Sequence, residues 1–142
     1  MDEPKMDEPK RDHVSRWLRK SQHDLESARR LAEGDDPLLD TAVYHCQQAA
    51  EKAVKAFLVL HDVRVPKTHN LVDLIGEASA FTSDYAAVSK TAKRLTQYAT
   101  LFRYPDVSLD PTQAEYEQAY HDASQFVAIT LALIPAEAHP AS

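Results

Sequence analysis

The stretch that decides the fold is TAVYHCQQAAEKAVKAFLVLHD, residues Thr41–Asp62. It contains neither Gly nor Pro, and its apolar side chains recur at intervals of three and four residues, which places them on one face of a helix. These apolar residues are Val43, Cys46, Ala50, Ala53, Val54, Phe57 and Leu60. The spacing predicts a long helix whose apolar face lies in the core of the protein.

The opposite face of this predicted helix carries the polar side chains His45, Gln48, Lys52 and Lys55. Lysine supplies a compact charge for phosphate, and an amide can bond the edge of a base or ribose, so this polar stripe is a candidate nucleotide site. The alternative is a solvated face that carries an i,i+4 ion pair between Glu51 and Lys55. The sequence alone leaves both interpretations open.

The composition favours helix throughout the chain. The 142 residues suffice for one domain, and the two glycines, Gly34 and Gly76, leave little material for hairpin turns. Residues with high helix propensity fill the stretches between the prolines. We therefore predict an all-α fold with one core.

Further helical patterns flank the central one. We predict helices over residues 11–33, 71–78, from Ser83 or Asp84 to about 102, and from near Pro111 to about 134, joined by short loops. Asp40 or Thr41 is the expected N-cap of the central helix, and Thr68 or Asn70 that of the next. This order predicts an antiparallel bundle of four or five helices, and a bundle of this size often dimerises to cover apolar surface.

The ends of the chain have a different composition. The start reads MDEPK twice in succession, with a Pro in each copy and four acidic residues. Such a segment buries too little apolar surface to order itself. We therefore expect flexible tails at residues 1–10 and 135–142, on either side of a helical domain at 11–134.

The net charge is −6, from 16 basic and 22 acidic side chains. An acidic total argues against a general coat for nucleic acid, because phosphate binding needs a basic surface. Every Lys and Arg lies at or before Arg103, however, so a local basic face remains compatible with this total.

The remaining composition bears on location and cofactors. Cys46 is the single cysteine, and its place on an apolar stripe indicates a buried thiol in a reducing setting. No apolar run approaches the length needed to cross a bilayer, and the charged start does not resemble a signal peptide, so we expect a cytoplasmic protein. The histidines do not group at ligand spacing, so we predict no metal site and no cofactor.

Several short motifs occur together in a fixed order, and they resemble the HEPN family of prokaryotic helical domains over about residues 13–133. The motifs that carry the resemblance are Trp17, the pair Asp24-Leu25, QQAAEKA at Gln47–Ala53, THNL at Thr68–Leu71 and RYPD at Arg103–Asp106. The resemblance implies an all-α fold and a homodimer. It also implies a minimal nucleotidyltransferase as partner, in a toxin-antitoxin or nucleotide-handling pair, with nucleotide or RNA as ligand.

Some members of that family are metal-independent RNases with an Arg, four to six intervening residues and a His. This sequence departs from that pattern, because Arg103 is followed by YPDVSLDP and the next histidine is His121. A formal match occurs at Arg64–His69, in a predicted loop, and we interpret it as a coincidence of spacing. For His69 we favour a place in helix-capping chemistry over a role as general base.

The loop after the fourth predicted helix supplies the last candidates, Arg103, Tyr104 and Asp106, with Arg103 for phosphate and Tyr104 for stacking on a base or as a modification target. A cation at a helix C-terminus also complements the helix dipole, which explains Arg103 without a ligand. If this loop covers the polar stripe, we expect Arg103 and Lys52 to converge on one anion.

Three hypotheses about function follow from these observations. The first is a dimer that binds nucleotide or RNA and works with a nucleotidyltransferase. The second is a metal-independent endoribonuclease toxin that uses Arg103, or Arg64 and His69. The third is a structural partner protein without a ligand. Because the sequence contains no glycine-rich phosphate loop, Ser-His-Asp order or paired carboxylates, a self-contained enzyme is the less favoured interpretation.

Overall fold

A computed structural model describes residues 4–104, 106 and 108–141. Over these residues the chain forms helices and no strand, which confirms the predicted all-α fold. The α-helices are α1 (Glu8–Ala32), α2 (Leu39–Leu60), α3 (Leu71–Ala78), α4 (Ser89–Phe102) and α5 (Gln113–Leu133). Two short 3-10 segments, η1 (Asp84–Val88) and η2 (Ala136–Ala138), precede α4 and follow α5.

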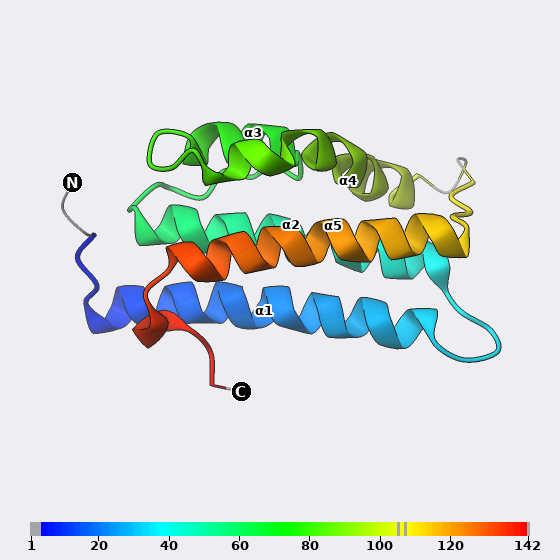
Figure 1. Cartoon of the computed structure of the whole chain (residues 1–142), viewed down its shortest axis with the longest axis horizontal. Helices are drawn as coiled ribbons and strands as arrows, with labels where there is room; N and C mark the ends of the chain where they lie inside the picture. Colours follow the sequence, from blue (N-terminus) through cyan, green and yellow to red (C-terminus); the bar gives the residue numbers. More distant parts are fainter. Residues whose placement is uncertain (1–3, 105, 107, 142) are drawn as a thin grey trace.

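Helix α2 is the element around which the others pack. Figure 1 shows α1, α2 and α5 running lengthwise beside one another, with α3 and α4 as a shorter layer over α2 and α5. The colour order along the ribbons shows that α2 and α5 run opposite to α1. Because α2 contacts α1, α3, α4 and α5, it has few directions left that face solvent.

The apolar stripe predicted for α2 is buried along its whole length, from Val43 to Leu60. Burial also extends beyond the stripe, to Gln47, Gln48, Glu51 and Lys55. The interpretation of this polar face as solvated is therefore wrong for Gln48 and Lys55. The physical reason is that neighbouring helices surround α2, so the polar residues of α2 also lie against protein.

The structure differs from the expected tails at both ends. Helix α1 begins at Glu8, inside the stretch expected to be flexible, because the Asp7 side chain caps the Lys10 amide and Pro9 is tolerated in a first turn. Residues 1–3, which belong to the same predicted tail, lie outside the described residues. At the other end, Ala138 of η2 is buried in a small apolar cluster with Val14 of α1.

Side-chain caps differ among the starts of α2, α3 and α5. Helix α2 has Leu38 rather than Asp40 or Thr41 as its N-cap, and the Asp40 carboxylate instead accepts the Thr41 amide. Asn70 caps α3 through the amides of Val72 and Asp73, in agreement with the prediction. Thr112 and Glu115 form a reciprocal capping box that starts α5. Side-chain caps therefore mark the starts of α3 and α5, whereas Leu38 makes no side-chain cap hydrogen bond at the start of α2.

The central position of α2 can be tested with one pair of leucines. Leu58 is fully buried on α2, whereas Leu38, at its N-cap, is 51% exposed. We expect Leu58→Ala to lower the free energy of unfolding by about 2–5 kcal/mol, because it leaves a cavity in the core. The same change at Leu38 should cost about 0.5 kcal/mol or less, which urea denaturation measures. Equal losses at the two positions would contradict the arrangement.

The C-terminal end of α2 carries a histidine packed between aromatic rings. The His61 ring lies 4.4 Å from the Phe81 ring in a stacked arrangement and 4.6 Å from the Phe57 ring. Burial lowers the pKa of His61, and the nearby Lys10 ammonium lowers it further. The folded protein therefore favours the neutral imidazole.

This geometry predicts an acid-sensitive contribution to stability. Because the pKa of His61 is lower in the folded state, the unfolded chain binds more protons, and stability falls as the pH drops below about 6.5. We expect His61→Phe to be less sensitive to acid between about pH 7 and 5 than the parent protein. Thermal unfolding across this range measures the difference, with His121→Phe, exposed on α5, as the control. Parallel pH profiles for parent and His61→Phe would refute the assignment.

Candidate functional site

A nearly buried carboxylate on α2 lies at the centre of the candidate site. Glu51 is 3% exposed, and its Oε1 accepts hydrogen bonds from His69 Nδ1 at 2.8 Å and Gln47 Nε2 at 3.4 Å. Its Oε2 lies 3.2 Å from Lys55 Nζ, so the predicted i,i+4 ion pair is present. A buried charge is costly unless it is paired and hydrogen-bonded, and here both conditions hold.

The loop before α3 brings His69 onto this carboxylate. The loop backbone is held in place because Gln47 Nε2 donates to the His69 carbonyl at 3.0 Å. On the other side of the imidazole, Nε2 lies 2.8 Å from an Arg103 guanidinium nitrogen. A guanidinium has only donors, so Nε2 accepts and Nδ1 carries the proton that is donated to Glu51. The two contacts therefore select one tautomer and one orientation of His69.

Arg103 reaches the site from the C-terminal end of α4. It is the C-cap residue of that helix and is exposed to solvent. Its position also complements the negative end of the helix dipole, so the structural role considered from the sequence remains valid. Together, Arg103, His69, Glu51 and Lys55 form a continuous chain of contacts from the surface to the interior, which we call the arginine–histidine site.

The two lysines of the predicted stripe form ion pairs with carboxylates of the same chain. Lys52 Nζ lies 2.5 Å from Asp24 Oδ2 of α1, and His45 Nδ1 lies 2.7 Å from the other oxygen of the same carboxylate. Lys55 pairs with Glu51 and lies 5.8 Å from the centre of the Trp17 ring, as a cation–π contact. Lys52 and Arg103 therefore have separate partners within the chain, and their convergence on one bound anion stays a prediction.

The other predicted residues fall in different places. Gln48 donates to the side-chain oxygen of Gln47 at 2.7 Å, which links it indirectly to the arginine–histidine site. Tyr104 is 58% exposed, and Asp106 is also exposed, beyond Arg103. Arg64 lines an open hollow with Lys10 and Asp62 at the C-terminal end of α2. His69 is thus paired with Arg103 and not with the arginine five positions before it.

An aromatic pair lies beside this site. The ring of Tyr44, on α2, stacks on that of Phe102, the last residue of α4, with centroids 4.3 Å apart and planes at 17°. Tyr44 also meets the His45 ring edge-on at 5.7 Å. Phe102 remains 38% exposed although it is a large apolar side chain. Neither Tyr44 nor Phe102 is among the candidates that the sequence patterns indicate.

The structure also bears on metal binding, thiol chemistry and membranes. Within the described ranges, no three His, Cys, Asp or Glu side chains are placed to hold a metal ion together. Burial, together with the nearby Asp122 carboxylate, raises the pKa of the Cys46 thiol to about 12, so this thiol is a weak nucleophile. Among the helices of the described residues, none has the length and apolar character that a membrane span requires.

Sequence reasoning also missed the role of two acids. Glu51 appeared only as a partner for Lys55, and Asp24 only as part of a motif, yet both carboxylates are buried and both orient a histidine. A signal for Asp24 was present, since it lies three residues after Ser21 on the face of α1 that packs on α2. A carboxylate on the buried face of a helix needs a hydrogen-bonding partner, so its position in the sequence predicts a polar contact with another helix.

Comparison with known proteins agrees with this architecture. The model of the HEPN domain family matches residues 14–133. The crystal structure of TT1696 from Thermus thermophilus has 27% sequence identity and a TM-score of 0.71, covering 87% of this chain and 99% of that one.

The crystal structure of ST0689, described as an archaeal HEPN homologue, has 26% identity and a TM-score of 0.69, over 86% of this chain and 98% of its own. No curated protein matches the chain significantly. Because the family model spans most of the sequence and its fold recurs in these solved structures, the chain belongs to the HEPN domain family.

Proposed function

We propose that this HEPN protein binds nucleotide or RNA at the arginine–histidine site. The observation that carries the proposal is the exposed Arg103 guanidinium, held 2.8 Å from an imidazole that a buried carboxylate orients. Within the described part of the chain, His69 is the one side chain that the guanidinium bonds. The other N–H groups of the guanidinium are then available to a phosphate, which this planar group binds in bidentate fashion.

The distribution of charge supports a ligand with few phosphates. Lys52 and Lys55 are compensated by Asp24 and Glu51, so Arg103 is the exposed cation of the site. The net charge of the protein is −6, so the surface outside the site repels a long polyanion. We therefore expect a mononucleotide or a short single-stranded segment to bind, with a shallow dependence on salt.

The assembly is part of the same proposal. We infer that the protein acts as a homodimer in the cytoplasm and works with a minimal nucleotidyltransferase, in a toxin-antitoxin pair. The support for this is the match to the HEPN domain family and what the family resemblance implies.

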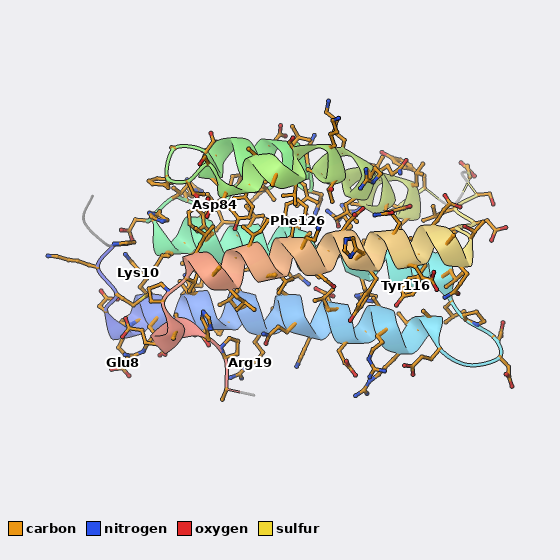
Figure 2. The ribbon with its side chains drawn as sticks, viewed as in Figure 1. Glu8, Lys10, Arg19, Asp84, Tyr116 and Phe126 are labelled. Carbon is orange, nitrogen blue, oxygen red and sulfur yellow. The ribbon has the colours of Figure 1, made fainter. Side chains whose placement is uncertain are left out.

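The first test of binding is the loss of the guanidinium. We expect Arg103→Ala to weaken binding of adenosine triphosphate, or of a short single-stranded RNA, about tenfold or more, because charge-assisted hydrogen bonds to phosphate are lost. Isothermal titration at low salt measures the affinity. The matched control is Arg19→Ala, which removes an exposed arginine on α1 that points away from α4 in Figure 2. Unchanged affinity in Arg103→Ala would overturn the proposal.

A second candidate function is RNA cleavage, and the contact between Arg103 and His69 favours it. If the guanidinium moves onto a phosphate, His69 Nε2 is free to accept the proton of a 2′-hydroxyl while Glu51 holds the other ring nitrogen. The 2′-oxygen then attacks the adjacent phosphorus. The 5′-oxygen leaves with a proton returned by the imidazolium, and the product is a 2′,3′-cyclic phosphate. Arg103 would stabilise the charge that develops on the phosphoryl oxygens.

Cleavage is tested with single-stranded RNA in EDTA, which removes metal-dependent contaminants. If the protein is an RNase, His69→Ala should lower the cleavage rate about 10²–10⁴-fold, and Arg103→Ala should also abolish most activity. The control His121→Ala, an exposed histidine on α5, should cleave like the parent. Cleavage that survives both site variants would contradict catalysis by this pair. If the parent protein does not cleave RNA, cleavage is refuted and binding remains as the proposed function.

A further inference from the structure

The stacked pair of Tyr44 and Phe102 has features that packing between helices does not require. Phe57 and Phe126 are at most 2% exposed in the core, whereas Phe102 keeps 38% of its surface in solvent. The Tyr44 ring covers one face of Phe102 at a centroid distance of 4.3 Å. Exposing apolar surface costs roughly 25 cal/mol per Å², so a buried position would be more favourable for this ring.

The pair is positioned directly beside the phosphate-binding group. Phe102 and Arg103 are consecutive in the chain, so their Cα atoms lie about 3.8 Å apart. Tyr44 precedes His45, whose ring it contacts edge-on, and His45 is itself fixed by Asp24. The aromatic pair is thereby supported from α2, and the exposed ring belongs to the residue next to Arg103 in the chain.

We infer that Phe102, backed by Tyr44, is a platform on which an unpaired nucleobase stacks while Arg103 binds the adjoining phosphate. This inference rests on the proposed binding function and names the ligand class, a base-bearing phosphate whose base is not paired. Aromatic rings hold unpaired bases by stacking, and every base offers a face for it. The platform therefore selects for a base in general and not for a particular sequence.

The experiment compares ligands that have the same phosphates with and without bases. A short single-stranded oligoadenylate is paired with an abasic strand of the same length, and adenosine monophosphate with ribose 5-phosphate. We expect Phe102→Leu to weaken binding of the base-bearing ligands about fivefold or more and to leave the base-free ligands unchanged. The strand and mononucleotide arms distinguish RNA from free nucleotide as the source of the base.

Two variants serve as controls for shape and exposure. Phe102→Trp keeps an aromatic face, so it should retain or increase the affinity for base-bearing ligands. Because it tests the same position with the ring retained, the platform can still be tested if the leucine variant fails to fold. Val72→Ala changes an apolar residue of α3 that has the same 38% exposure, and it should bind all ligands like the parent. Size-exclusion chromatography of each variant reports whether the oligomeric state of the parent is retained.

The outcomes separate the platform from the binding function. If Arg103→Ala loses affinity but Phe102→Leu does not, the binding function stands and the platform is refuted. If Phe102→Leu becomes monomeric and weakens base-bearing and base-free ligands equally, the ring belongs to a subunit interface, and the platform is again refuted. If the parent protein binds none of the four ligands, the binding function itself has failed, and the platform fails with it.

Discussion

The burial of the Glu51 carboxylate is the constraint on which the rest of the site depends. A carboxylate this far from water requires donors on every side, and α2 supplies two of them, Gln47 and Lys55. The third donor has to come from another part of the chain, and His69 provides it from the loop before α3. The same requirement that stabilises the carboxylate thereby positions an imidazole at the surface, where Arg103 meets it.

A second buried carboxylate is also paired with a histidine and a lysine, where α2 packs against α1. Asp24 of α1 is buried and binds His45 and Lys52. The two acids hold two histidines and two lysines in place, so the polar face of α2 is a set of satisfied internal pairs. Within the described residues, no buried side-chain nitrogen or oxygen lacks a hydrogen-bond partner. The positive charge that the site presents to solvent is therefore that of Arg103.

The period of α2 was sufficient to predict the central helix and its core residues, because a continuous apolar stripe requires one face of a helix to be buried. The burial of its polar face was not predictable in this way, since it arises from the packing of several helices around α2. Helix α3 and its Asn70 cap were predictable for the same local reasons. The start of α1 was not, since acidic residues and prolines are typical both of a disordered tail and of a capped first turn. Local composition does not distinguish these two cases.

The candidate site was predictable only in part. Arg103 and His69 were each recognised as polar loop residues, but they are 34 positions apart, and their contact arises from the packing of α3 and α4 on α2. A motif defined by spacing pairs residues that are close in the sequence, so it indicated Arg64 as the partner of His69 and not Arg103. The stack of Tyr44 on Phe102 was missed for the same reason, since each aromatic residue alone is consistent with ordinary core packing.

The contact between Lys55 and Trp17 has an optical consequence. Trp17 is the single tryptophan of the chain, and the ammonium that lies 5.8 Å from its ring is paired with the carboxylate that holds His69. Two side chains, Lys55 and Glu51, separate the indole from His69, so we expect a rearrangement at Arg103 and His69 to change the electric field at the indole. The intrinsic fluorescence of Trp17 is therefore expected to report on the interior of the site without any added label.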